Sequence, residues 1–243
     1  LLSGFRKPEE DKQAGLFEKT KLVEHRADLE RRARIQQMID TGDIEGAHKA
    51  IYEDPLTGLL NSRAWKEAEA KARNEGKIFG SIDVSGLGWI NDNFGHSGGD
   101  ALLQEVANSL KAVGVEGYRK GGDEVAAIFD NQEIADKLLK KAQDVLANTT
   151  IEVTTPDAKK YNYKGWRLDY GTGKDFDAAD ADLYAGRAEQ VKAGVRGTTK
   201  GAKPYGVVEA VPEGVEAGGE IEAPKVAEAK DQRKTEPSAK IAE

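Results

Sequence analysis

A pair of glycines, Gly121 and Gly122, separates two short segments that read EGYRK and EVAAIFD. Glycine adopts the backbone conformations of a tight turn without steric cost, so this pattern predicts a β-hairpin. Two adjacent carboxylates, Asp123 and Glu124, follow the glycines and stand ahead of an apolar run. Like charges at neighbouring positions repel each other. The hairpin therefore needs a partner for its acids as well as a sheet for its apolar residues.

Around this hairpin, the segment from 54 to about 198 alternates helical and strand patterns. Four helices are predicted, in SRAWKEAEAKARNEG (with Ser62 as N-cap and Gly76 as the stop), GDALLQEVANSLKAVG, NQEIADKLLKKAQDVLANT and DAADADLYAGRAEQVKAG. Further strands are predicted in KIFGSIDV, TIEVTTP and YKGWRLDYGTG. Helices that alternate with strands on a mixed sheet give an α/β or α+β sandwich.

The N-terminal region, residues 1–52, has a different pattern. Its first turn cluster after residue 8 is TGD at 41–43, and apolar residues recur at roughly helical spacing amid dense charge. We expect a long amphipathic helix and then a short one that ends near Tyr52. The long helix is either a solvated helix on the domain or part of a parallel coiled coil. Its apolar seam is shorter and less regular than a secure coiled coil requires.

The C-terminal region, residues 201–243, is rich in Ala, Glu, Lys, Pro and Gly and has hardly any large apolar side chain. Such a segment buries too little surface to offset its ordering entropy, so we expect a disordered tail. The stretch YGVVEAV is the exception, because it has the composition of an edge strand.

Composition restricts the partners of the chain. There is no cysteine, which excludes disulfides and thiolate metal sites, and any metal must be held by oxygen or by one of three histidines. The net charge of −7 argues against a general nucleic-acid surface. No apolar run approaches the length of a membrane span. We expect a cytoplasmic protein with neither a membrane nor a nucleic acid as partner.

Two of the acids are expected to meet at one edge of the sheet. Asp83 ends the predicted strand KIFGSIDV, and Asp123 lies at the tip of the hairpin that we expect beside it. Both carboxylates then converge on one hard cation, and Mg²⁺ prefers such ligands while keeping waters and substrate phosphates. Gly121 and Gly122 let the backbone approach a ligand closely. An exposed acidic hairpin without a ligand is the alternative.

Four blocks of sequence resemble the GGDEF domain of diguanylate cyclases. In chain order they are DPLTGLLNSRAW at 54–65, SIDVSGLGWINDNFGHSGGDALL at 81–103, RKGGDEV at 119–125 and ADADLYAGR at 179–187. The resemblance implies an α+β, nucleotidyl-cyclase-like fold with a mixed, mainly antiparallel sheet flanked by helices. The cyclase-like domain would span 53–200, after an N-terminal helical extension that would serve in dimerisation.

By this resemblance, Asp83 and Asp123 bind the catalytic metal, Mg²⁺ or Mn²⁺, together with the carbonyl of Val84. Glu124 lies next to the metal and helps to deprotonate the attacking hydroxyl. The resemblance thus makes Asp83, Asp123 and Glu124 the catalytic acids.

The resemblance also assigns residues that bind the substrate GTP. Asn91 and Asp100 match the positions that recognise guanine, and an amide and a carboxylate suit the hydrogen-bonding edge of that base. The local alternative is that Asn91 caps a helix and Asp100 is the N-cap of ALLQEVANSL. Arg187 and Lys192 supply positive charge for the phosphates, beside the glycine pair at 121 and 122.

Several family letters are replaced in this chain. Ser85 replaces the second Asp of D-x-D, Gly88 replaces a lysine that contacts the triphosphate, and Val125 replaces the final Phe of the signature. Val191 replaces an arginine, with Lys192 next to it. Loss of a cation beside a triphosphate removes electrostatic stabilisation, so substrate binding is expected to be weak.

The resemblance implies a homodimeric diguanylate cyclase that condenses two GTP into cyclic di-GMP and pyrophosphate. Each subunit holds one GTP, and the N-terminal helices set the distance between the two domains. Two alternatives stay open: a degenerate module that binds GTP or a protein partner without turnover, and a segment of a larger multidomain protein.

Overall fold

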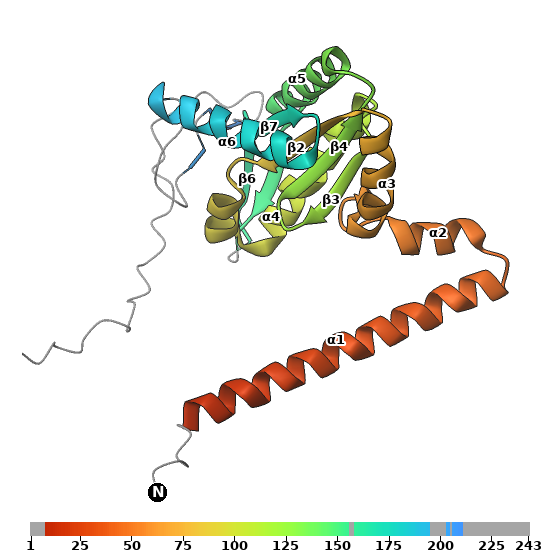
Figure 1. The fold of residues 1–243 in the computed structure, drawn as a ribbon. Helices are drawn as coiled ribbons and strands as arrows, with labels where there is room; N and C mark the ends of the chain where they lie inside the picture. The colour runs from red at the N-terminus through yellow and green to blue at the C-terminus, as the bar shows by residue number, and fades with distance from the viewer. Residues whose placement is uncertain (1–7, 156–157, 195–202, 205, 211–243) are drawn as a thin grey trace, which may run out of the picture.

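A computed structural model of the chain describes residues 8–155, 158–194, 203–204 and 206–210. A five-stranded sheet forms its centre (Figure 1), in the order β1-β3-β4-β2-β7. Its strands are β1 (Leu60–Asn61), β2 (Ile78–Val84), β3 (Gly117–Gly121), β4 (Glu124–Phe129) and β7 (Leu168–Gly173). Within this sheet, only β1 and β3 pair in parallel. The fold is therefore α+β with a mixed, mainly antiparallel sheet, as predicted.

Helices cover both faces of this sheet, and they are α3 (Ser62–Asn74), α4 (Leu87–Ala112), α5 (Gln132–Asn148) and α6 (Phe176–Lys192). Side chains alternate along β4: Val125, Ala127 and Phe129 pack in the core with α4 and α5, whereas Ala126 packs in a second core with α3 and α6. This period of two follows from the pleat of a strand. Figure 1 shows α6 crossing the sheet over β2 and β7.

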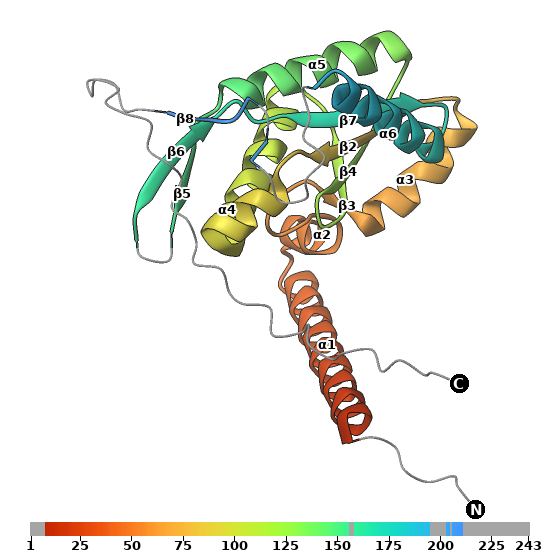
Figure 2. The same cartoon turned by 90° about the vertical axis from the view of Figure 1, so that its left-hand side faces the viewer.

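A second sheet extends the domain on one side (Figure 2), with β5 (Ile151–Thr154), β6 (Lys160–Lys164) and β8 (Val208–Glu209) in the order β5-β6-β8. The segment YKGWRLDYGTG, predicted as one strand, is instead the end of β6 and the whole of β7. Gly165 takes a positive φ of 88° between them, and Trp166 is fully buried there. The edge strand foreseen in YGVVEAV is β8, which pairs with β6. Residues 211–243 lie outside the described part of the chain.

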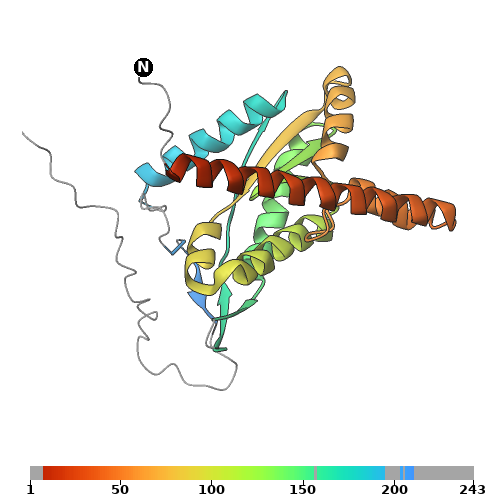
Figure 3. The ribbon, with the colours of Figure 1, turned by 90° about the horizontal axis from the view of Figure 1, so that it is seen from below.

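The described part of the N-terminal region forms α1 (Pro8–Asp40) and α2 (Ile44–Tyr52), the predicted long helix and short helix. Figure 1 shows α1 as a long arm below the domain, and in Figure 3, which is seen from below, α1 crosses in front of the domain. The expected amphipathic face is not covered: Leu22, Val23 and Leu29 are each more than half exposed. Where α1 meets α2, Arg31 Nη2 donates a hydrogen bond to the carbonyl of Ala50 at 2.5 Å.

One helix start differs from the prediction. The N-cap of α3 is Asn61, whose side chain accepts hydrogen bonds from the backbone of Arg63 and Ala64, and Ser62 is already helical. Asn61 satisfies two amides and also donates to the carbonyl of Ile51, which a serine side chain is too short to do. The predicted stop is correct, since α3 ends just before Gly76, whose φ is 67°.

Candidate functional site

Three acids lie side by side at one end of the central sheet. Asp83, near the end of β2, is the register partner of Glu124 in β4 on one side and of Asp169 in β7 on the other. Directly opposed residues of antiparallel strands project to the same face of the sheet. The expected hairpin is present as β3 and β4, and Asp123 lies at its tip. The structure thus places Asp83 opposite the first residue of β4, next to the GGDE turn.

A cation from α6 already lies among these acids. Arg187 forms an ion pair through Nη2 with Oδ1 of Asp83, and its Nε donates to Oδ2 of Asp169 at 3.0 Å. The side chains of Arg187 and Asp83 are 17% and 22% exposed, and that of Asp169 is 2% exposed. The sequence predicted that Arg187 binds phosphate and did not predict a role for Asp169. The only sequence signal for Asp169 is that it is a charged residue within a predicted strand.

The position of Arg187 depends on close packing of α6 against β7. A Cβ added to Gly171 of β7 would lie 2.1 Å from the backbone nitrogen of Leu183 and 2.4 Å from the carbonyl oxygen of Ala179. Only a glycine permits this approach of helix to strand. The backbone of α6 thereby brings Arg187 within reach of the acids.

Burial governs the charge state of Asp83. It raises the pKa of Asp83 to about 6, because removal from water outweighs the attraction of Arg187, and the nearby negative charge of Asp123 acts in the same direction. Burial by itself lowers the pKa of Arg187. The charges of Asp83 and Asp169 raise it by more, so the pKa of Arg187 is above its usual value. Arg187 is thus a permanent cation beside an acid that titrates in the mildly acidic range.

Arg119 of β3 connects the hairpin tip to the DPLTG loop at residues 54–58. Gly122 has a positive φ of 52°, and its carbonyl oxygen accepts hydrogen bonds from Nε and Nη2 of Arg119 at 3.1 and 2.9 Å. Arg119 also pairs with Asp54 at 3.0 Å, and Asp54 accepts from the Thr57 hydroxyl at 2.7 Å. Burial raises the pKa of Asp54, but these hydrogen bonds more than offset it and lower the pKa overall.

The residues assigned to guanine lie on α4. Oδ1 of Asn91 is buried and has no hydrogen-bond partner among the described residues. Asp100 is exposed beyond Gly95, where a φ of 74° kinks the helix. Both capping interpretations are wrong, because the N-cap of α4 is Gly86 and both side chains belong to residues within the helix. The amide oxygen of Asn91 packs against Gly99, where an added Cβ would lie 2.1 Å from it, and it is a buried acceptor that no described group satisfies.

The other positions that the sequence singled out form no ion pair or side-chain hydrogen bond with the acids at the sheet end, in the part of the chain that the structure describes. Lys192 is exposed at the last residue of α6, and Val84 is buried at the end of β2. Around Gly88, on the first turn of α4, an added Cβ would meet nothing within 4 Å. Within the described ranges, no group of three or more His, Asp or Glu side chains is arranged to hold a metal ion. The acids share an edge, but Arg187 occupies the space between two of them.

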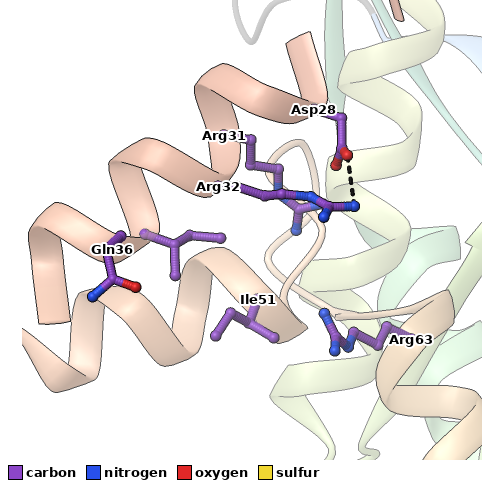
Figure 4. Close-up of a pocket in the computed structure, with 7 residues that line it drawn as sticks. Asp28, Arg31, Arg32, Gln36, Ile51 and Arg63 are labelled. Carbon is purple, nitrogen blue, oxygen red and sulfur yellow. Dashed lines mark ion pairs between the residues drawn. The ribbon is translucent and has the colours of Figure 1, made fainter. Parts of the chain in front are cut away.

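A pocket of about 390 Å³ lies elsewhere, between α1, α2 and α3 (Figure 4). Three arginines line it with Asp28, Ile35, Gln36 and Ile51. Arg32 pairs with Asp28 at 2.8 Å, and these side chains are 74% and 47% exposed. The one acid among the lining residues, Asp28, is paired with Arg32. We therefore place the functional site at the acidic edge, the end of the central sheet that carries Asp83, Glu124 and Asp169.

Comparison with known proteins points to one family. Residues 51–166 match the sequence model described as "Diguanylate cyclase, GGDEF domain". The diguanylate cyclase DgcP of Escherichia coli is 37% identical over 94 residues, which are 35% of this chain and 28% of that protein. The diguanylate cyclase VdcA of Vibrio cholerae is 25% identical over 142 residues, 56% of this chain and 41% of that protein. The chain thus spans less than half the length of these relatives.

Solved structures agree on the fold. The diguanylate cyclase SiaD of Pseudomonas aeruginosa, solved with its activator SiaC, aligns with a TM-score of 0.52 and 22% identity over 74% of this chain and 76% of that chain. The coiled coil and GGDEF domain of DgcB from Caulobacter crescentus, solved with c-di-GMP, aligns with a TM-score of 0.52 and 19% identity over 70% and 94% of the two chains. In the part of the chain described here, no helix combines the length and apolarity needed to cross a membrane.

Proposed function

The chain carries a GGDEF domain, and on that premise we propose that it condenses two GTP molecules into cyclic di-GMP and pyrophosphate. The observation that carries this proposal is the alignment of Asp83 with Glu124 beside the Gly121–Gly122 turn. Acids and a tight glycine turn at one sheet edge suit a nucleotide triphosphate with its counter-ion.

The donors at this edge are oxygen atoms, the kind that Mg²⁺ and Mn²⁺ prefer, although the described side chains do not already surround an ion site. Asp83, Asp123 and Glu124 would hold the ion with the carbonyl of Val84. When bound, the ion would neutralise phosphate charge and lower the pKa of the 3′-hydroxyl. Glu124 is exposed at the start of β4 and would accept the proton of that hydroxyl.

The other residues bind and orient GTP. Asn91 would use its buried, unpartnered Oδ1 to accept a hydrogen bond from the guanine, and Asp100 would accept from another donor of the base. Arg187 and Lys192, on one helix, would contact the phosphates. The backbone at Gly121 and Gly122 would allow the phosphate chain to lie against the turn, since an added Cβ there meets nothing within 4 Å.

Formation of a cyclic product from two GTP requires two such sites that face each other, so we propose a homodimer. The arm α1, with the exposed apolar residues Leu22 and Leu29, would pair with its copy and bring two domains together. Holding both reactants in one assembly converts their encounter into an intramolecular step.

The test is to incubate the purified chain with GTP and Mg²⁺ and to measure cyclic di-GMP by chromatography. Asp123→Asn and Glu124→Gln should each abolish product, whereas Glu133→Gln, an exposed acid on α5, should not change it. Binding of GTP without product from the unmodified chain would support the degenerate module, which Ser85, Gly88 and the Asp83–Arg187 pair favour. Absence of both binding and product would leave an interaction module.

A further inference from the structure

Asp169 is a buried acid that the proposed reaction does not use. Its side chain is 2% exposed, and it lies opposite Asp83 across the β2–β7 register. A carboxylate is rarely buried to this extent without a charged partner, because removal from water is costly. Asp169 has such a partner in Arg187, whose Nε donates to it at 3.0 Å.

The geometry divides the guanidinium of Arg187 into an inner and an outer end. The inner nitrogen, Nε, is held by buried Asp169, while the outer nitrogen Nη2 contacts the more exposed Asp83. A planar guanidinium can bind two carboxylates at once because its donors have a fixed fork geometry. The close contact of α6 with Gly171 fixes the helix that carries it.

We propose that Asp169 is a positioning residue that holds Arg187 across Asp83. In this arrangement Arg187 is the built-in counter-ion of Asp83 in the absence of ligand, and its outer nitrogens face the place where an anion arrives. A triphosphate then replaces Asp83 as the partner of these nitrogens, while Nε stays on Asp169. The identity of that anion as GTP rests on the proposed function, but the arrangement of the three residues does not.

A purely structural role for Asp169 predicts a different outcome. In that case its neutralisation would lower thermal stability and leave ligand affinities of the folded protein unchanged. Two binding measurements follow, and neither requires turnover. The first tests Arg187 as the counter-ion of Asp83, and the second separates the positioning role of Asp169 from a structural one. Thermal unfolding of every variant is recorded beside them, so that stability and affinity are judged independently.

The first measurement is the affinity for Mn²⁺ alone, by electron paramagnetic resonance of the free ion. Arg187→Gln should tighten binding about tenfold, because it removes a cation in direct contact with Asp83. Asp169→Asn should not tighten it, because Arg187 is retained and a negative charge is lost. Arg73→Gln, which breaks an exposed ion pair on α3, is the matched control and should have no effect. Unchanged Mn²⁺ affinity in Arg187→Gln would overturn the proposal.

The second measurement is a double-mutant cycle on binding of 3′-deoxy-GTP with Mg²⁺. Asp169→Asn and Arg187→Gln should each weaken binding about tenfold, and the double variant no more than Arg187→Gln alone. Additive effects, or none for Asp169→Asn, would contradict the proposal. If Asp169→Asn does not fold, Arg187→Lys replaces it: this variant keeps the charge without the fork, and unchanged affinity there would equally contradict a positioning role.

Failure of the proposed function has a different signature. If the chain binds 3′-deoxy-GTP with the expected coupling but makes no cyclic di-GMP, the cyclase proposal fails and the role of Asp169 stands. If it binds no nucleotide, the positioning role of Asp169 fails together with the cyclase proposal, and the Mn²⁺ measurement tests only whether Arg187 is the counter-ion of Asp83. If cyclic di-GMP forms but the affinities do not respond as stated, the cyclase proposal stands and the role of Asp169 fails.

Discussion

The acidic edge of the sheet and the helical arm α1 are both rich in opposite charges, but they hold them in different ways. At the edge, Arg187 is 17% exposed and contacts two acids from two strands. On α1, Arg26 pairs with Glu30 one turn away, and the side chains are 82% and 65% exposed. Exposed pairs contribute little and tolerate exchange, whereas a buried charge that loses its partner is strongly destabilising. The comparison predicts that substitutions of the same chemical kind have very different effects in the two regions.

The largest effect is expected at the centre of the acidic edge. Asp83→Asn should lower the rate of cyclic di-GMP formation about a thousandfold, because it removes an oxygen ligand of the ion that neutralises the phosphates. On α1, Asp28→Asn breaks the exposed pair with Arg32 and should leave the rate within about twofold. Steady-state rates of the two variants at equal concentration make the comparison. Similar rates in both would remove the distinction between the regions.

The next effect tests the packing that brings Arg187 to the edge. Gly171→Ala should reduce the free energy of unfolding by about 2–3 kcal/mol, because its Cβ would overlap the backbone of α6. Gly186→Ala, on α6 itself, meets nothing within 4 Å and should raise stability by about 0.5–1 kcal/mol through helix propensity. Chemical denaturation measures both. Equal changes would show that α6 does not depend on the glycine of β7.

Loss of the contacts that Arg119 makes with Gly122 and Asp54 should have an intermediate effect on the reaction rate. Arg119→Ala removes the donors to the Gly122 carbonyl and the partner of Asp54, so we expect about a tenfold lower kcat at saturating GTP. Arg63→Ala, whose side chain is 67% exposed on α3, is the control. A change in KM alone would mean that Arg119 acts on binding rather than on the position of the acids.

A pH dependence follows from the raised pKa of Asp83. Metal binding needs the carboxylate, so affinity for Mn²⁺ should fall by up to about tenfold per unit as pH drops below about 6. The folded state holds this proton more tightly than the unfolded chain does, so the contribution of Asp83 to stability decreases as pH rises from about 4 to about 6. Titration of Mn²⁺ at several pH values checks the first statement. An affinity that is flat between pH 5 and pH 7 would contradict it.

The smallest effect belongs to α1. Arg26→Gln should change the free energy of unfolding by less than about 0.5 kcal/mol, because the pair with Glu30 is exposed on both sides. A larger loss would show that the arm contains a specific contact of the kind found at the acidic edge.

What the sequence predicted correctly depends on short-range patterns. The hairpin follows from two glycines between apolar strands, and the place of Asp83 follows from its position at the end of a buried run. The N-cap interpretation of Asp100 was wrong because it also depended on a short-range pattern. The glycines before Asp100 resemble a helix start, but in the structure α4 continues past the kink at Gly95 and Asp100 lies inside it.

What the sequence did not predict depends on contacts between distant segments. The pair of Asp169 with Arg187 exists only because α6 packs on β7 at Gly171, and nothing in the neighbouring residues of either partner indicates it. The division of YKGWRLDYGTG is similar, since it depends on burial of Trp166 in the core. Tertiary packing decides such features, and local propensity does not report it.

The central claim is that the acids at the ends of β2 and the hairpin bind one divalent ion. Paramagnetic broadening by Mn²⁺ in the amide NMR spectrum tests this most directly. We predict that the amides of Val84, Gly122 and Glu124 broaden first, while that of Arg26 on α1 stays sharp. Broadening elsewhere on the chain, with these three amides unaffected, would contradict the account.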